Sequence, residues 1–305
     1  NMKKIKVGIP RALLYYRYGV LWKNYLESLG VNVILSPETN HEIVDLGVNN
    51  TIDECCLSYK IYIGHALYLS EKCDYLLISR VCDYGKKDKS CTRLNGIYDN
   101  LRCLLPESML LDIDIEHTKH KYQFMSLLKI GLKFTKNPIK IISSYIYALK
   151  KQKTYDITKE QETKNKLSKS NKKILIMSHF YNVKDKYISG YIIDYLEKNN
   201  ITPIFSNYLN KKTATKFSEY FSNTLYWKYS KEMIGALYYY YHQVDGLIFI
   251  STYPCGVDSL VNNLAIRKNK QLPILNLLID ENITDLSLET KLESFIDILR
   301  GANNE

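Results

Sequence analysis

The sequence lacks any long hydrophobic run: no stretch approaches the ~18 consecutive apolar residues of a membrane-spanning helix. Its first residues, NMKKIKVG, are typical of a strand and unlike a signal peptide. We therefore expect a soluble, cytoplasmic protein. In such a compartment a disulfide framework is not expected, so the seven cysteines need another explanation.

Several short motifs are also missing. There is no G-x-G-x-x-G and no G-x-x-x-x-G-K-[ST], so neither a typical dinucleotide fingerprint nor a P-loop ATPase is predicted. No C-x-x-C pair occurs, which argues against a local zinc ribbon, a thioredoxin motif and a ferredoxin-type cluster run. Any metal site must therefore be assembled from cysteines that are far apart in the chain.

What the sequence does have is enough apolar material for two cores. Its 305 residues are 46% hydrophobic and 24% charged, which excludes disordered, collagen-like and coiled-coil chains. At ~150 residues per domain, this length predicts two globular units.

The net charge of +10 is concentrated in one segment. Residues 129–173 contain thirteen lysines and three acids, and the rest of the chain is neutral. This stretch has few aromatic residues for stacking on bases, so nucleic-acid binding is not favoured. A basic surface that attracts an anionic metabolite or an acidic partner protein fits better, and residues 150–171 are typical of a solvated linker or an exposed helix end.

Short apolar runs alternate with segments of helical period, which indicates β-α-β units and parallel sheets. We predict an α/β protein with two Rossmann- or flavodoxin-like domains, at 1–118 and 173–305, separated by a helical insert and basic linker at 119–172 that is interrupted at Asn137-Pro138. Ligands are expected in a cleft between the domains, at the carboxyl ends of the strands. Strands are predicted over 5–9, 31–35, 75–79, 174–177, 203–205, 247–250 and 273–278, and helices over 12–29, 51–69, 188–198, 211–220, 230–242 and 288–299 and after Gly256.

Three cysteines occupy similar positions in this pattern. Cys56, Cys91 and Cys255 all fall where a loop leads into a helix, and Cys56 is placed in the first turn after a capping box that begins at Thr51. Helix N-termini favour thiolates, and three thiolates can hold a [4Fe-4S] cluster with one iron left for another ligand. The alternative is that these cysteines are small core hydrophobes, as we expect for Cys73 and Cys103; Cys55 and Cys82 fit either a core position or a spare ligand.

The residues resemble the proteins related to 2-hydroxyacyl-CoA dehydratase subunits, in the stand-alone form of the module found in large CoA-substrate-specific enzyme activases. The similar segments run through both halves: VGIPRAL at 7–13 followed by Trp22, SPETN at 36–40, DECCLSYK at 53–60, Cys91 before LNG at 94–96, HFYN at 179–182, PCGVDS at 254–259, LIDE at 278–281 and ETKLE at 289–293.

The resemblance implies a [4Fe-4S]-type cluster bound by Cys56, Cys91 and Cys255 between two α/β domains, with low-potential, oxygen-sensitive electron chemistry on acyl-CoA-type substrates. In such systems an ATP-hydrolysing activator supplies the electron, and some relatives carry double-cubane clusters. The chain departs from the family pattern at Ser58, Arg93, Phe180 and Val257, positions at or near which the family has proline. These departures affect loop shape and substrate fit more than the metal ligands.

Several polar residues are further candidates near this site. Arg11 and Lys60 could hold an anionic group, while Tyr181 and Asn182, expected in a loop after a strand, could face the cluster. Asp53, Glu54, Asp258 and Ser259 are candidates as well, with helix capping as the default role, and Ser259 is counted as a possible further site residue. Among the histidines His65, His179 and His242, a core or surface position is the default, and His179 is the most site-like.

The sequence therefore favours an iron-sulfur protein of dehydratase-like or reductase chemistry that depends on a separate activator and forms homo- or hetero-oligomers. The fourth iron of the cluster would take water, substrate, Cys55 or Cys82 as its remaining ligand. The alternative is a non-catalytic acyl-CoA-binding or activator-docking module, with residues 129–173 as the docking surface. A zinc protein or a metal-free structural protein is a third hypothesis.

Overall fold

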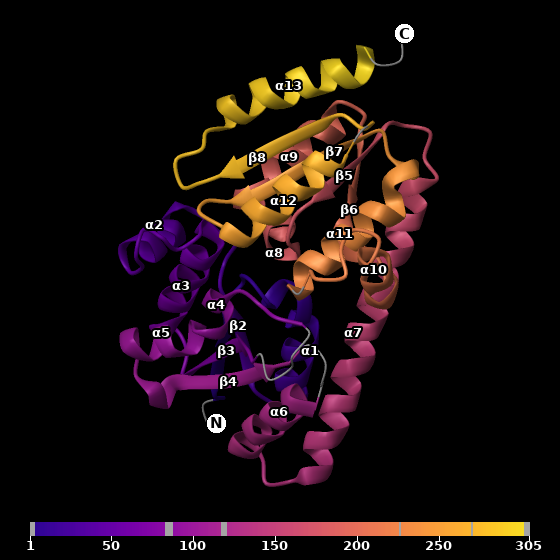
Figure 1. Ribbon diagram of the computed structural model, residues 1–305. Helices are drawn as coiled ribbons and strands as arrows, with labels where there is room; N and C mark the ends of the chain where they lie inside the picture. Colours follow the sequence, from indigo (N-terminus) through magenta and orange to yellow (C-terminus); the bar gives the residue numbers. More distant parts are fainter. Residues whose placement is uncertain (1–3, 83–87, 117–120, 226, 270, 302–305) are drawn as a thin grey trace. The chain divides into compact units, whose positions relative to one another are not determined.

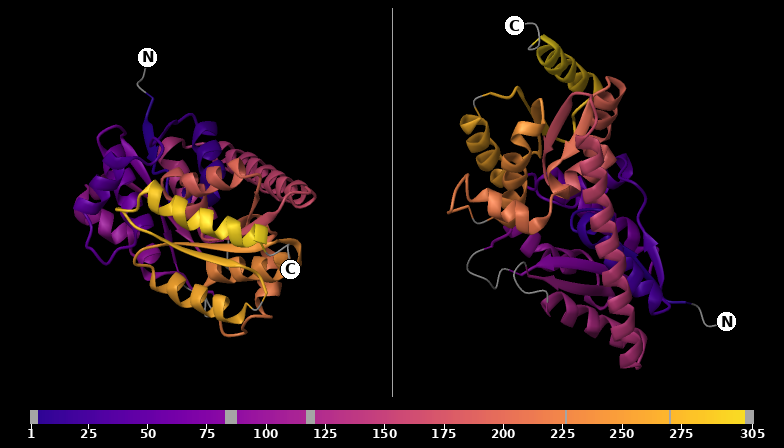
Figure 2. Two further views of the ribbon diagram at one scale, coloured as in Figure 1. Left: turned by 90° about the horizontal axis from the view of Figure 1, so that it is seen from above. Right: turned by 90° about the vertical axis from the view of Figure 1, so that its right-hand side faces the viewer.

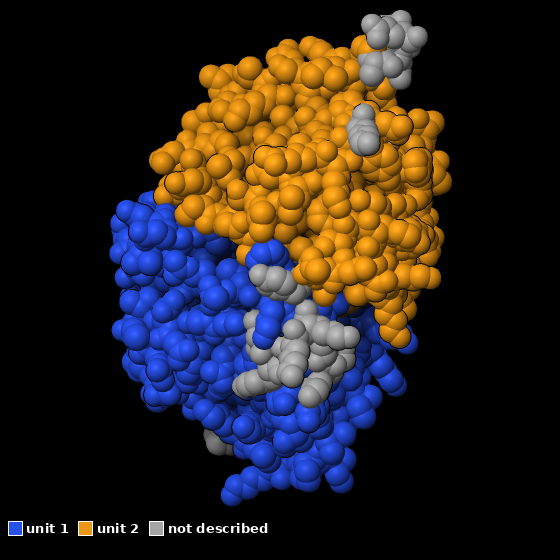
Figure 3. Space-filling model, in the orientation of Figure 1, with its two compact units in different colours: residues 1–156, 226–228 blue, residues 157–225, 229–305 orange. Residues whose placement is uncertain are grey.

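The computed structural model describes residues 4–82, 88–116, 121–225, 227–269 and 271–301. The chain divides into two compact units, unit 1 (residues 1–156 and 226–228) and unit 2 (157–225 and 229–305), which Figure 3 shows in blue and orange. Within the described residues each unit contains one parallel sheet of four strands with helices around it (Figure 1). The predicted α/β class with two parallel-sheet domains is confirmed.

The sheet of unit 1 has the strand order β2-β1-β3-β4. Its strands are β1 (Lys6–Ile9), β2 (Asn32–Leu35), β3 (Tyr75–Val81) and β4 (Leu110–Ile115). The helices that belong to this unit are α1 (Tyr15–Ser28), α2 (His41–Asn49), α3 (Leu57–Ser70), α4 (Thr92–Asn95), α5 (Ile97–Leu104), α6 (Lys121–Phe134) and the first part of α7 (Pro138–Leu167).

Helix α3 is the most deeply buried helix-forming segment of unit 1, because eleven of its residues are buried. Its buried residues run without a break from Leu57 to Ala66 and include Ser58, Lys60 and His65, so they cover all sides of the helix. On one side it meets α2 at Gly47 and Gly64, where a Cβ on either glycine would overlap a backbone carbonyl oxygen, that of Lys60 or of Ile43. The two helices thus approach each other at backbone distance, which only glycine permits.

Unit 2 repeats the topology with the strand order β6-β5-β7-β8. Figure 1 shows α13 on one side of β8 and α12 on the other, and Figure 2 shows α13 lying across the sheet of this unit in the view from above. The strands are β5 (Lys173–Met177), β6 (Thr202–Phe205), β7 (Gly246–Thr252) and β8 (Ile274–Ile279), and the helices are α8 (Phe180–Lys184), α9 (Lys186–Lys198), α10 (Lys211–Ser218), α11 (Lys228–Tyr240), α12 (Gly256–Lys268) and α13 (Asp285–Gly301).

The basic segment is largely helical. α6 ends at Phe134 and α7 starts at Pro138, so the predicted break at Asn137-Pro138 is confirmed; Lys119 and His120 of the predicted insert lie outside the described residues. Of the two alternatives for residues 150–171, the exposed helix end is confirmed up to Leu167 and the solvated linker is wrong there. This stretch contains neither glycine nor proline, and the Lys159–Glu162 and Lys164–Glu160 pairs support the helix at 2.6 and 3.1 Å.

Polar contacts hold each part of α7 in its own unit. In unit 1, the buried Gln152 accepts a hydrogen bond from the backbone N–H of Leu21 and donates one to the carbonyl oxygen of Arg17, at 3.1 and 3.2 Å. In unit 2, the Nζ of Lys166 donates to the carbonyl oxygen of Pro203 at 3.4 Å. The division between the units falls inside this helix, between Asp156 and Ile157.

The capping box predicted at Thr51 is wrong. The Thr51 hydroxyl donates to the carbonyl oxygen of Gly47 at 2.8 Å, so it closes the end of α2, a helix that the sequence analysis missed. Helix α3 starts only at Leu57, and Asp53 and Glu54 lie exposed in the turn before it. The true cap of α2 is Asn40, whose side chain accepts from the N–H of Ile43 at 3.0 Å.

Candidate functional site

The three candidate cysteines share one local geometry. Cys56 is the N-cap residue of α3, Cys91 that of α4 and Cys255 that of α12, each with extended backbone (ψ of 150, 138 and 102°). All three side chains are partly exposed, and none makes a side-chain capping hydrogen bond. The predicted placement at loop-to-helix junctions is confirmed, except that Cys56 precedes its helix instead of lying in its first turn.

In unit 1 the segments that carry Cys56 and Cys91 come close to a common residue, Tyr59. Burial raises the pKa of the Tyr59 phenol, and the thiol of Cys56 and the guanidinium of Arg93, two residues after Cys91, lie near enough to act on it electrostatically. Asn100 of α5 donates to the same phenol oxygen at 2.5 Å. The start of α3 and the α4–α5 region therefore meet inside this unit.

The remaining cysteines differ from these three. Cys55 is buried, Cys73 donates to the carbonyl oxygen of Leu69 at 3.1 Å with its pKa raised by burial, and Cys82 lies 3.3 Å from an Asp114 oxygen. Cys103 is exposed, so the expectation of a core position is wrong for it: residue 103 lies on the outer face of the amphipathic helix α5. As a spare ligand, Cys82 would have to give up its contact with Asp114, which also binds Arg80.

Cys255 lies at the edge of a pocket in unit 2, at the carboxyl end of β7. The pocket has a volume of about 380 Å³ and carries no charged side chain. Ser259, Asn262 and Asn263 extend along the same face of α12 as Cys255, and the amide of Asn262 is buried with its Oδ1 lacking a hydrogen-bond partner within the described chain. The other lining residues are Ser251, Tyr253, Pro254, Gly256, Asn276 and Leu278.

A buried His–Asp pair involves Asp258, which follows Cys255 by three residues in the chain. The Nε2 of His179, the N-cap residue of α8, lies 2.8 Å from Oδ1 of Asp258 in the first turn of α12, and their side chains are 7% and 3% exposed. His179 also stacks on Tyr181, with ring centroids 5.0 Å apart. Asp258 thus faces a neighbouring segment instead of capping its own helix. The two residues are 79 positions apart, so no spacing in the sequence predicts that they pair.

The loop expected around Tyr181 and Asn182 is a short helix. Asn182 is fully buried and donates to the Ser178 hydroxyl at 3.3 Å, and that hydroxyl donates to the carbonyl oxygen of Ile250 at 2.5 Å. These bonds tie the end of β5 to β7. In the structure Asn182 therefore holds the strand ends together, and its placement facing a cluster stays a prediction.

Arg11 and His65 come together at the carboxyl end of β1. The backbone N–H of Arg11 donates to the Ser36 hydroxyl at 2.8 Å. Burial lowers the pKa of His65 to about 3, and the positive charge of the Arg11 guanidinium lowers it further in the same direction. His65 is fully buried with Nε2 3.0 Å from the Thr39 hydroxyl, which confirms its expected core position. Lys60 is buried on α3, with only 4% of its surface exposed, so it is not the solvated base that an exposed helix position would give.

No group of three or more His, Cys, Asp or Glu side chains able to hold a metal is found among the described residues. Cys56 and Cys91 belong to unit 1 and Cys255 to unit 2. Their convergence on one cluster stays a prediction.

Comparison with known proteins identifies the family. No curated protein matches the chain. Separately, no helix among the described residues is long and apolar enough to cross a membrane. One similar solved structure is a carbohydrate transporter from Acidothermus cellulolyticus 11B in complex with myo-inositol, with 9% identity and a TM-score of 0.21 over 90% of this chain and 74% of the other. A family model described as the CoA enzyme activase uncharacterised domain matches residues 6–209, a span that includes Cys56 and Cys91 but not Cys255. The chain therefore belongs to the CoA enzyme activase-related family that this domain defines.

Proposed function

We propose that this protein is an iron-sulfur protein in which the thiolates of Cys56, Cys91 and Cys255 bind one [4Fe-4S]-type cluster. When bound, such a cluster supplies one-electron transfer at low potential. The protein would receive electrons from an ATP-hydrolysing activator and use them in dehydratase-like or reductase chemistry on an acyl-CoA-type substrate. Membership of a CoA enzyme activase-related family supports a role in a system that includes such an activase.

The observation that carries the proposal is the shared N-cap position of the three cysteines. Each thiol is partly exposed and is followed by the first N–H groups of a helix. Such groups favour a negatively charged ligand set, most strongly at the longer helices α3 and α12. The donor atoms are the thiolates that iron-sulfur clusters require, so the residues present fit the group.

The neighbouring residues would hold and screen the site. Arg93 places a positive charge two residues after Cys91, which offsets negative charge on the thiolates. The contact between His179 and Asp258 fixes the first turn of α12 and so orients Cys255. Because Cys255 belongs to unit 2, the proposal requires ligands from both units.

Anaerobic reconstitution with iron and sulfide tests the proposal. We expect about four iron atoms per chain and an electron paramagnetic resonance signal after reduction with dithionite. Cys56→Ala, Cys91→Ala and Cys255→Ala should each lose most of the iron, whereas Cys103→Ala, which removes an exposed thiol on α5, should keep it. A Cys255→Ala protein with its full iron content would refute the assignment.

A second candidate function, docking of an activator protein, is favoured by an exposed apolar stripe on α7. We define the α7 stripe as Ile139, Ile142, Ile146 and Leu149, which are 77%, 46%, 48% and 40% exposed. Their alternating spacing of three and four residues is that of a coiled-coil seam. The basic segment 129–173, which contains the stripe, has thirteen lysines. This combination suits an amphipathic helix with acidic flanks.

The docking candidate is tested with a purified ATP-hydrolysing activator in a binding titration. Ile142→Glu together with Ile146→Glu should weaken the complex at least about tenfold and leave cluster content unchanged, because an apolar contact is lost and the cysteines are untouched. Ile298→Glu, at an exposed isoleucine of α13, is the matched control. Binding that is insensitive to the stripe variants, or self-association in place of activator binding, would contradict this function.

A further inference from the structure

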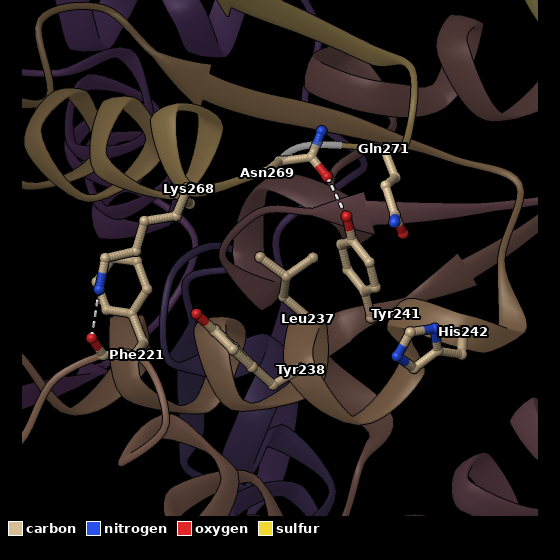
Figure 4. Close-up of a pocket in the computed structure, with 9 residues that line it drawn as sticks. Phe221, Leu237, Tyr238, Tyr241, His242, Lys268, Asn269 and Gln271 are labelled. Atoms are coloured by element: carbon tan, nitrogen blue, oxygen red, sulfur yellow. Dashed lines mark hydrogen bonds between the residues drawn. The ribbon is translucent and has the colours of Figure 1, made fainter.

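Unit 2 has another pocket, at the end of its sheet opposite Cys255. Its lining residues come from the segments that precede β7 and β8, so it lies at the amino-terminal side of these strands (Figure 4). The volume of about 330 Å³ falls at the lower end of the ~300–1,000 Å³ typical of small-molecule sites. It therefore fits a ligand of the size of one ring system with a small substituent.

The walls of this pocket are mainly aromatic and apolar. Leu237 and Tyr238 come from α11, Tyr241 from the turn after it, and Phe221 from the segment before it. The ring centroids of Phe221 and Tyr238 lie 6.3 Å apart. Burial raises the pKa of Tyr238, so its phenol remains neutral at physiological pH.

Hydrogen bonds fix the wall opposite α11. The Tyr241 hydroxyl donates to Oδ1 of Asn269 at 2.6 Å, as Figure 4 shows, and the Asn269 amide donates to the carbonyl oxygen of Leu272 at 2.7 Å. The side chain of Asn269 is therefore committed to the protein. These bonds join the turn after α11 to the segment before β8, so both walls are preformed.

Two polar side chains remain for a ligand. Within the described chain, no hydrogen bond engages the amide of Gln271 or the ring nitrogens of His242, and both residues line the pocket. The cation of Lys268 is already placed: its Nζ donates to the carbonyl oxygen of Phe221 at 2.6 Å and lies 4.3 Å from the centre of that ring. The pocket thus offers flat apolar surface and the hydrogen-bonding side chains of Gln271 and His242.

We propose that this pocket binds a planar heteroaromatic ring, specifically a purine base. A flat ring can stack on the tyrosine side chains, and the edge of a purine carries both donors and acceptors, which an amide such as that of Gln271 pairs with from one side. An aliphatic ligand would make no use of the Gln271 amide, and an anion would find only a cation that is already bonded. The site is separate from the cysteines and does not depend on the proposed cluster.

Isothermal titration with adenosine tests this proposal, with ribose as the negative control. Adenosine should bind and ribose should not, and AMP should bind within a few-fold of adenosine because the base carries the interaction. Tyr238→Leu should weaken adenosine binding about tenfold and Gln271→Ala about fivefold. The matched control is Tyr239→Leu, since Tyr239 is the next residue of the same helix and does not line the pocket.

The outcomes separate clearly. Adenosine binding that Tyr238→Leu and Gln271→Ala weaken and Tyr239→Leu leaves unchanged supports the site. Absence of adenosine binding, binding of AMP alone, or equal effects of Tyr238→Leu and Tyr239→Leu overturns it. Gln271 is exposed, so its variant is expected to fold and keeps the test valid even if Tyr238→Leu loses stability.

Discussion

The two sheets share one topology but carry different chemistry at equivalent places. Cys91 precedes the first helix between β3 and β4, and Cys255 precedes the helix between β7 and β8. These are the same position in the strand orders β2-β1-β3-β4 and β6-β5-β7-β8. The repeated fold thus creates the same loop-to-helix junction twice, and in both units the residue at that junction is a cysteine.

Around these junctions the two units differ. Unit 1 holds every cysteine except Cys255, whereas the surroundings of Cys255 are rich in amides and hydroxyls. After the first strand of each sheet, unit 1 has Arg11 near a neutral buried His65, and unit 2 has His179 against Asp258. The fold determines where a functional side chain can be placed, and the local sequence determines which chemistry is placed there.

The largest expected effect tests whether the two junctions are equivalent. If Cys91 and Cys255 are both cluster ligands, Cys91→Ala and Cys255→Ala should lose iron to the same extent after anaerobic reconstitution. The Cys73 thiol donates to the carbonyl oxygen of Leu69, so the Cys73→Ala protein should retain its iron. Iron loss in only one of the two junction variants would show that the equivalence is topological and not functional.

A second comparison concerns helix packing. Gly64→Ala in unit 1 and Gly235→Ala in unit 2 would each push a Cβ into a backbone carbonyl oxygen, that of Ile43 or of Ala214. We expect each to lower the free energy of unfolding by about 1–3 kcal/mol or more, measured by urea denaturation. Gly301→Ala, with no atom near the added Cβ, is the control. If the units unfold separately, each variant should shift only one transition.

The smallest expected effect concerns the pH dependence of stability that the buried His65 of unit 1 causes. The pKa of His65 is lowered to about 3 in the folded protein, below the ordinary histidine value of 6.5, so the unfolded chain binds the proton more readily. Its contribution to stability is present above pH 6.5 and is lost as the pH falls toward 3; between pH 7 and 5 the loss is about 2 kcal/mol. In denaturation experiments His65→Gln should reduce this pH dependence. An unchanged slope in that variant would contradict the assignment.

Much of the fold could be predicted from the sequence because strands and helices with regular apolar periods carry their own signal. The predicted strand over 174–177 matches β5, and the predicted helix over 188–198 matches α9. Misassigned segments carried a misleading local motif: T-x-x-E at Thr51 imitates a capping box, yet Thr51 closes the preceding helix. The short helix α8 was missed because five residues are too few to show a helical period.

The candidate site was predictable only in part. The positions of Cys56, Cys91 and Cys255 before helices followed from the order of strands and helices along the chain. Cys255 and Ser259 were sequence candidates, and Asn262 and Asn263 extend them at helical spacing along α12, so the sequence carried a signal for these two amides as well. The pairing of His179 with Asp258 had no sequence signal, since it depends on where two distant segments pack.

By itself, the sequence determined the α/β class, the two-unit plan and the placement of three thiols at helix starts, because these depend on short-range periodicity and on residue type. The tertiary structure alone decided which polar groups became buried partners: His65 with Thr39, His179 with Asp258 and Gln152 with the backbone of α1. Such contacts arise when close packing removes water from side chains that are distant along the chain, and no local pattern encodes that arrangement.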